Sequence, residues 1–152
     1  MDLSPIPRSG GARAGRSDAT WDDGSVKIVE LDHLVLTVRD VERTLDFYRD
    51  VLGMSVSAFE GGRLALKFGS HKINLHQAGE ELTPHADRPL PGSADLCFLT
   101  DGPVAAWVDH FESLQIPIAD GPVPRTGALG PMTSVYVRDP DGNLIEIASY
   151  GE

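Results

Sequence analysis

The sequence predicts an α+β fold built from two copies of one unit, in which a strand and a helix are followed by three strands. The first observation is that this order of elements occurs twice, in two halves of roughly 50 residues each. The second is a segment rich in proline and glycine, residues 79–92, which separates the halves. The third is a strand–turn–strand pattern at 134–148, which closes the second half.

The domain boundaries follow from composition. Residues 1–25 contain many glycines, prolines and charges and few apolar residues, so we expect them to form a disordered tail. Residues 26–152 are expected to form a single domain, with module one at 27–78, a linker at 79–92 and module two at 93–150.

Module one begins with a strand at 29–38, whose successive side chains alternate between its two faces. A helix follows at 41–52, and Asp40 is its expected N-cap. The helix carries an apolar stripe, and Gly53 is a suitable residue to end it. The stripe consists of Val41, Leu45, Tyr48 and Leu52. Three short strands are expected at about 54–59, 63–68 and 72–77.

Module two repeats this order with a strand at 94–100 and a helix at 103–114, capped by Asp101. A further strand begins at 116–118, and a loop rich in glycine and proline is expected at 120–131. The turn of the final hairpin is Asp-Pro-Asp-Gly, residues 139–142, in which each residue type favours a tight turn.

The formal net charge of −10 argues against nucleic acid and anionic membranes as partners. The single cysteine, Cys97, excludes an internal disulfide bond and suits a reducing compartment. No apolar run approaches the ~20 residues of a membrane span, and no apolar segment typical of a signal peptide follows the N-terminus. We therefore expect a cytoplasmic protein.

Five polar residues occupy strand positions whose neighbours are apolar. In the last strand Ile145 and Ile147 face one way and Glu146 faces the other, because side chains alternate along a strand. Superposing the two halves by pattern matches His33 with Asp95, and Asn74 with Glu146 with a slip of one residue in the turn. The residues expected to line one trough are His33, Asn74, His76, Asp95 and Glu146.

Imidazole and carboxylate groups that converge in this way indicate a site for Zn²⁺, Ni²⁺, Co²⁺, Mn²⁺ or Fe²⁺. Two histidines and one carboxylate that leave coordination positions open form a common catalytic metal site. The alternative is that these are solvent-facing polar residues on half-buried strands, which is the usual state of an isolated polar residue.

Three segments of the sequence, 31–38, 44–53 and 139–146, resemble the vicinal oxygen chelate superfamily. It contains glyoxalase I, fosfomycin-resistance enzymes, extradiol dioxygenases, methylmalonyl-CoA epimerase and bleomycin-binding proteins. The resemblance covers about residues 27–150. Three shorter segments are similar to the glyoxalase-domain-containing protein five group, which includes bacterial virulence-associated glyoxalase-like proteins. These segments are 74–76, 91–95 and 121–127.

The resemblance implies paired βαβββ modules, a cupped eight-stranded mixed sheet and a homodimer. It also implies one divalent metal with exchangeable positions for two substrate oxygens. His33 and Glu146 fall on the ligand positions of the family, whereas Asp95 stands where a third ligand is usually histidine. Asn74 replaces the glutamate of glyoxalase I, so the ligand set of that enzyme is not reproduced. His76 is our hypothesis for a second imidazole ligand.

Further candidates concern the substrate. Tyr136 falls where fosfomycin-resistance enzymes carry a substrate-contacting tyrosine, and we place it with Glu146 as a catalytic residue, its phenol donating to an oxyanion. Arg125, in the expected loop, is a candidate contact for a carboxylate or phosphate. The alternatives are an aromatic residue packed in the hairpin and a solvated arginine. Asn74 and Thr37 complete the predicted substrate-binding set.

The expected function is therefore that of a metal-dependent lyase or isomerase acting on a small substrate that is chelated through vicinal oxygens. An iron-dependent dioxygenase that uses His33, His76 and Glu146 is the first alternative. The second is a metal-free protein that sequesters a drug or metabolite, as bleomycin-resistance proteins do. A negatively charged chain would attract a cationic drug.

Overall fold

The computed structural model describes residues 26–151, and the expected disordered tail at 1–25 lies outside these residues. The chain divides into two units, Met1–Glu30 and Leu31–Glu152, and the second contains every helix and strand discussed below. Within residues 26–151 no helix is long and apolar enough to cross a membrane.

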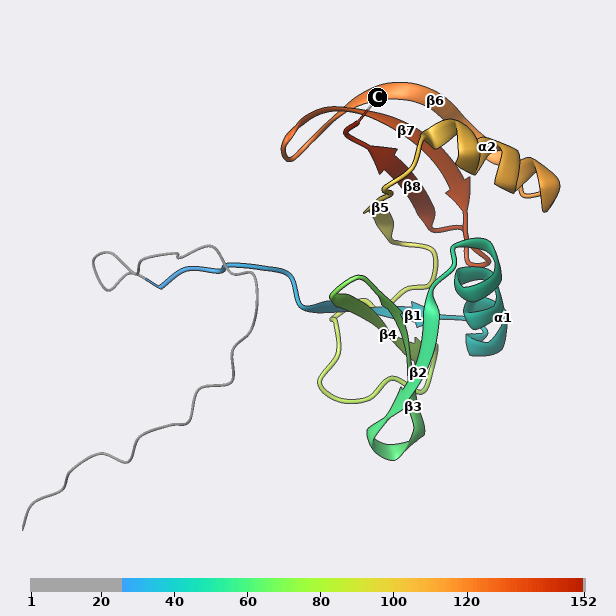
Figure 1. Ribbon diagram of the computed structural model, residues 1–152. Coiled ribbons are helices and arrows are strands. Elements are labelled where there is room, and N and C mark those ends of the chain that lie inside the picture. The colour runs from blue at the N-terminus through green and yellow to red at the C-terminus, as the bar shows by residue number, and fades with distance from the viewer. Residues whose placement is uncertain (1–25, 152) are drawn as a thin grey trace, which may run out of the picture. The chain divides into compact units, whose positions relative to one another are not determined.

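Both modules have the predicted order of elements (Figure 1). Module one consists of β1 (His33–Val38), α1 (Val41–Asp46), the π-helical turn η1 (Phe47–Val51), β2 (Ser55–Phe59), the short 3₁₀ turn η2 (Glu60–Gly62), β3 (Arg63–Phe68) and β4 (His71–Gln77). Module two consists of β5 (Asp95–Leu99), α2 (Val104–Ser113), β6 (Ile118–Gly127), β7 (Gly130–Arg138) and β8 (Leu144–Ser149).

The eight strands hydrogen-bond as two sheets of four, in the orders β1-β4-β3-β2 and β5-β8-β7-β6. In each sheet the first strand of the module pairs in parallel with the last, and the other pairs are antiparallel. The two modules thus have the same topology, which confirms the α+β fold with a duplicated βαβββ unit.

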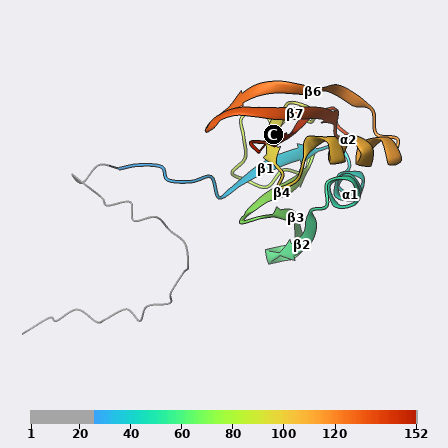
Figure 2. The same ribbon diagram turned by 45° about the horizontal axis from the view of Figure 1, so that its top comes forward.

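One apolar core serves both modules. The core-facing residues of the two sheets pack with the helices, and the rings of Phe68 in β3 and Phe98 in β5 meet edge to face with centroids 5.1 Å apart. The helices also meet, since Nε2 of His110 in α2 lies 2.8 Å from the carbonyl oxygen of Val51 at the end of η1. Figure 2 shows α1 and α2 side by side. Each sheet therefore uses one face for the core and leaves the opposite face open.

We call these two surfaces the first and second open faces. The first open face consists of His33, Val35, Thr37, Ser55, Ser57, Phe59, Arg63, Ala65, Lys67, Lys72, Asn74 and His76. The second open face consists of Asp95, Cys97, Leu99, Val123, Arg125, Met132, Ser134, Tyr136, Arg138, Leu144, Glu146 and Ala148.

Two predicted boundaries were wrong. The first strand begins at His33 rather than Val29, because its parallel partner β4 begins at His71 and offers no backbone groups to earlier residues. Asp101 does not cap α2. The residue at the cap position is Pro103, which has no side-chain acceptor, and Asp101 lies two residues before it.

The predicted loop at 120–131 was also wrong, because most of it is strand β6, paired with β7. Its prolines are tolerated since β6 is an edge strand, where one row of N–H groups needs no partner in the sheet. The pairing is irregular around Asp120, and it is regular from Val123 to Gly127. Arg125 therefore lies on a strand, opposite Met132.

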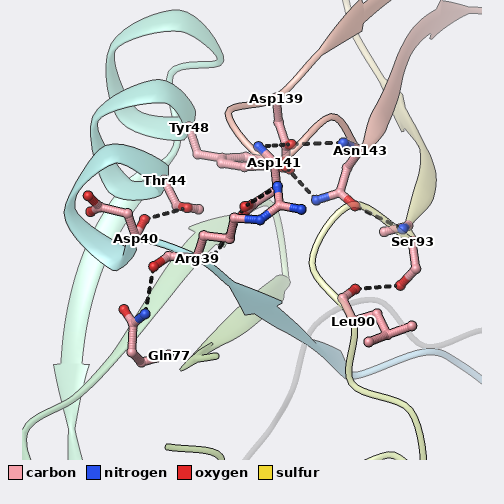
Figure 3. Close-up of polar contacts among 11 residues, drawn as sticks. Arg39, Asp40, Thr44, Tyr48, Gln77, Leu90, Ser93, Asp139, Asp141 and Asn143 are labelled. Atoms are coloured by element: carbon pink, nitrogen blue, oxygen red, sulfur yellow. Dashed lines mark hydrogen bonds and ion pairs between the residues drawn. The ribbon is translucent and has the colours of Figure 1, made fainter. Parts of the chain in front are cut away.

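A buried polar network holds the turn before β8 in place (Figure 3). The carboxylate of Asp139 accepts hydrogen bonds from the hydroxyl of Tyr48 at 2.8 Å and from the side-chain amide of Asn143 at 2.7 Å. It also accepts from the backbone N–H groups of Asp141 and Asn143, each at 2.9 Å. The side-chain oxygen of Asn143 accepts from the N–H of Ala94, just before β5. The network fixes the start of β8 and hence the face on which Glu146 lies.

Candidate functional site

Glu146 is at the centre of the second open face. Its neighbours across the sheet are Tyr136 in β7 and Cys97 in β5, and its carboxylate raises the pKa of both side chains. Glu146 is only 9% exposed, and its Oε1 atom is buried without a hydrogen-bond partner. A buried oxygen of this kind is costly unless a ligand or a cation satisfies it.

Arg125 positions the phenol of Tyr136. Its Nε donates to the Tyr136 hydroxyl at 3.0 Å, and its guanidinium lies over the ring, 5.4 Å from the centroid. A second guanidinium nitrogen pairs with Asp120 at 3.0 Å, which holds the arginine in this position. Burial, together with the nearby carboxylate of Glu146, raises the pKa of Tyr136. The phenol therefore stays protonated at neutral pH and can donate a hydrogen bond.

These side chains line a cavity of about 350 Å³. It brings together four predicted site residues, namely Asp95, Arg125, Tyr136 and Glu146, although Asp95 itself is exposed. The wall also includes Asp120. Sequence analysis did not single out Asp120, because its role depends on the pairing of β6 with β7.

The other predicted residues lie on the first open face. The parallel ladder pairs Val35 with Asn74 and Thr37 with His76. Asn74 is 4% and His76 is 6% exposed. The amide oxygen of Asn74 and both ring nitrogens of His76 are buried without partners. Burial, with the nearby charge of Arg63, lowers the pKa of His76, so its imidazole is neutral at pH 7.

His33 begins β1 on the same face, and its side chain is 42% exposed. Its Nδ1 lies 2.7 Å from a carboxylate oxygen of Asp32, and this hydrogen bond is the main cause of the lowered pKa of Asp32. A carboxylate that holds Nδ1–H leaves Nε2 with its lone pair free, as is usual for metal-binding histidines. Asp32 was not predicted, although the Asp-His pair in the sequence was a signal for it.

The two open faces do not form one site within a single chain. Among residues 26–151 no three His, Cys, Asp or Glu side chains lie close enough to hold a metal ion. Thr37 and His76 line a separate cavity of about 560 Å³, where β1 meets the linker with His85 and Arg88. The predicted site residues are therefore divided between the two open faces, and the metal set of His33, His76, Asp95 and Glu146 stays a prediction.

The unsatisfied polar atoms lie mainly on these faces. Within the described part of the chain, seven buried side-chain nitrogen or oxygen atoms lack a hydrogen-bond partner, and only the one on His71 lies elsewhere. The other six belong to Arg63, Asn74, His76, Ser134 and Glu146. Since folded proteins satisfy nearly all buried polar groups, this distribution indicates that both open faces receive a ligand or a partner.

Comparison with known proteins identifies the superfamily of the chain. Residues 30–147 match the model of the glyoxalase/bleomycin resistance protein/dioxygenase superfamily. The chain belongs to this superfamily. It is 54% identical to virulence protein STM3117 of Salmonella typhimurium over 123 residues, which cover 81% of this chain and 85% of that protein. The crystal structure of STM3117 superposes with a TM-score of 0.81 and covers 82% of this chain and 99% of that chain.

Two further proteins are similar to the chain. The glyoxalase domain-containing protein RDO1 of Mycosarcoma maydis is 54% identical over 125 residues, covering 82% of this chain and 70% of that protein. A lactoylglutathione lyase from Agrobacterium tumefaciens is 28% identical, with a TM-score of 0.61, and covers 81% of this chain and 97% of that chain. Superfamily membership confirms the predicted resemblance and establishes the fold, but it does not specify the reaction.

Proposed function

We propose that the protein is a divalent-metal-dependent enzyme that acts on a small substrate bound through two neighbouring oxygens, as a lyase or an isomerase. The observation that carries this proposal is the buried, unpartnered Oε1 of Glu146, which lies next to a protonated phenol held in place by Arg125. An oxygen ligand and an adjacent hydrogen-bond donor are the groups that such a reaction requires.

The candidate metal ligands are divided between the two open faces, and their chemistry suits a divalent metal. His33 offers Nε2 while Asp32 holds Nδ1, and His76 and Asn74 lie on the same open face with unpartnered atoms. The second open face offers Glu146 and Asp95. Nitrogen and oxygen donors of this kind suit Zn²⁺, Ni²⁺, Co²⁺, Mn²⁺ or Fe²⁺.

The complete site then needs two copies of the chain. We propose a homodimer in which the first open face of one protomer meets the second open face of the other. This arrangement covers the apolar side chains that the open faces leave exposed, Val35 at 44% and Leu99 at 62%. It also supplies partners for the buried polar atoms of both faces.

Each group of the second open face then has a role. A bound metal would act as a Lewis acid on the substrate oxygens. Glu146 would be one of the groups that hold the metal, and its carboxylate would act as a base for a proton on the substrate carbon. Tyr136 donates its hydroxyl proton to developing negative charge on a substrate oxygen, and Arg125 keeps the phenol oriented.

Elemental analysis of protein made without a histidine tag tests the metal. We expect about one divalent ion per chain in the wild type and a loss in His33→Ala and Glu146→Gln. His85→Ala is the matched control, because this histidine lies in the linker and outside the proposed ligand set. Iron in the wild type would favour the dioxygenase alternative. No metal after reconstitution with each ion would refute the enzyme and favour a metal-free binding protein.

A mixing experiment tests the shared site. His33→Ala and Glu146→Gln chains are unfolded, mixed and refolded together. A heterodimer then contains one site with both native residues and one with neither, so metal binding returns to the mixture. If each site lay within one chain, the mixture would bind no more metal than its components.

A further inference from the structure

The first open face is positively charged in a strongly negative chain. Strands β1, β2, β3 and β4 contain no aspartate or glutamate, although the chain carries a net charge of −10. The same strands carry Arg63, Lys67 and Lys72, all on the open face. Two carboxylates outside these strands act on the face, Asp32 on Lys72 and Glu81 on His76, but the charged side chains of the face itself are all positive, which favours anions.

Arg63 packs against an aromatic ring, and its Nε has no hydrogen-bond partner. Its guanidinium carbon lies 4.7 Å from the centroid of the Phe59 ring, and the Lys72 ammonium lies 4.2 Å from the same centroid. Its Nε is buried without a hydrogen-bond acceptor, and Arg63 forms no ion pair with any residue in 26–151. When a guanidinium lies over an aromatic ring, its N–H groups stay in the guanidinium plane. They can then donate hydrogen bonds to a carboxylate or a phosphate.

The neighbours of Arg63 are polar groups without partners. The pairing of Ala65 with Asn74 in the β3–β4 ladder places Arg63 across from His76. His76 has two unpartnered ring nitrogens, and Thr37 lies beside it in β1. A row of donors thus crosses three strands.

We propose that the substrate carries an anionic oxygen group, a carboxylate or a phosphate, which binds to Arg63 beside His76 and Thr37. This proposal rests on the proposed function in one respect: the reacting end of the substrate is taken to lie at Glu146 of the partner subunit. The anion accepts hydrogen bonds from the guanidinium of Arg63, from a ring N–H of His76 and from the hydroxyl of Thr37.

The observations favour a small anion over a nucleic acid or an acidic surface. The Nε of Arg63 is buried and has no hydrogen-bond partner, so only a small acceptor that inserts between the side chains of the face could reach it. The net charge of −10 repels a polyanion, whereas a single carboxylate or phosphate experiences mainly the nearby cations.

Binding of inorganic phosphate and of acetate, at constant ionic strength, tests the site. Calorimetry and thermal unfolding are measured for the wild type, Arg63→Met, Arg63→Gln and Lys67→Met. Lys67 is the matched control, because it lies on the same face and loses the same charge, but it is exposed and has no buried unpartnered atom. Circular dichroism checks that each variant is folded.

We expect at least one of the two anions to bind to the wild type and to Lys67→Met and to raise their Tm. Both Arg63 variants are expected to bind at least tenfold more weakly. A response to phosphate alone would identify the group as a phosphate, and a response to acetate alone would identify a carboxylate. Equal weakening in Lys67→Met, or no response of the wild type to either anion, would overturn the proposal.

Glu146→Gln separates this proposal from the metal site. It should lose the metal and still bind the anion, since Glu146 lies on the other open face. Metal binding in Arg63→Met should equal that of the wild type. Failure of anion binding with metal binding intact would therefore refute the anion site alone.

Discussion

The hydroxyl of Tyr48 donates a hydrogen bond of 2.8 Å to the carboxylate of Asp139, 91 residues further along the chain, and both side chains are buried (Figure 3). Tyr48 belongs to η1 of module one, and Asp139 belongs to the turn that starts β8 of module two. Burial of the phenol, together with the charge of Asp139, raises the pKa of Tyr48, so the phenol remains a donor. This bond ties the first helix to the strand that carries Glu146.

Tyr48→Phe should destabilise the protein by about 1–3 kcal/mol, because it removes a donor to a buried carboxylate and leaves the ring in place. The free energy of unfolding in urea measures the effect. Tyr150→Phe is the matched control. Its hydroxyl accepts from the N–H of Leu129 at 3.1 Å in an exposed setting, so its loss should cost about 0.5 kcal/mol. An equal loss of unfolding free energy in the two variants would show that the Tyr48–Asp139 bond contributes no more to stability than the exposed bond of Tyr150.

Cys97 reports on the charge of Glu146. Cys97 is exposed, but partial desolvation, with the nearby carboxylate of Glu146, raises the pKa of its thiol to about 11. Alkylation by iodoacetamide should be slow at pH 8 and should accelerate as the pH rises towards 11, since the thiolate is the reactive form.

Glu146→Gln removes the negative charge, so it should lower the pKa of Cys97 and speed alkylation at pH 8. The thiolate fraction rises about tenfold for each unit by which the pKa falls. Asp120→Asn, which removes a carboxylate that does not influence Cys97, should leave the rate unchanged. A rate in Glu146→Gln that equals the wild-type rate would place Glu146 away from the thiol.

Arg125 and Glu146 shift the pKa of Tyr136 in opposite directions. The positive charge of Arg125 favours the phenolate, whereas the negative charge of Glu146 opposes it. In metal-free protein, Arg125→Met should therefore raise the pH at which Tyr136 ionises, and Glu146→Gln should lower it. The ultraviolet absorbance of tyrosinate follows the titration, and Tyr136→Phe identifies its component. A shift of the same sign in both variants would contradict the arrangement.

Gly121 lies where the irregular part of β6 passes close to β7. It has a φ of +97°, and a Cβ atom there would approach the carbonyl oxygen of Ser134 to 2.5 Å. Gly121→Ala should therefore destabilise the protein through both backbone strain and a clash. Gly69→Ala is the control, because its φ is +50° and nothing lies within 4 Å. It should cost about 1–2 kcal/mol in urea unfolding, and a Gly121 variant that costs no more would show that β6 can move aside.

Local pattern was sufficient for much of the structure. The repeated order of strand, helix and three strands was readable because period-2 and period-3.6 alternation reflects contacts between near neighbours. The stripe residues Leu45, Tyr48 and Leu52 are buried as expected. The alternation around Glu146 predicted its face correctly, with Ile145 and Ile147 in the core.

Features that depend on distant partners were not readable. Residues 120–127 have the composition of a loop, and they form a strand only because β7 offers them an edge. The start of β1 depends on where β4 begins. The link between Tyr48 and Asp139 arises only when the two modules pack together.

The sequence by itself determined the fold class, the duplicated unit and the polar residues on each strand face, because these follow from side-chain alternation and turn chemistry. Only the tertiary structure decided that the predicted site residues divide between the first and second open faces and line two separate cavities. It alone identified the unpartnered nitrogen of Arg63 and the pairing of Asp32 with His33. The physical reason is that the burial and partners of a side chain depend on the elements that pack around it, wherever they lie in the chain.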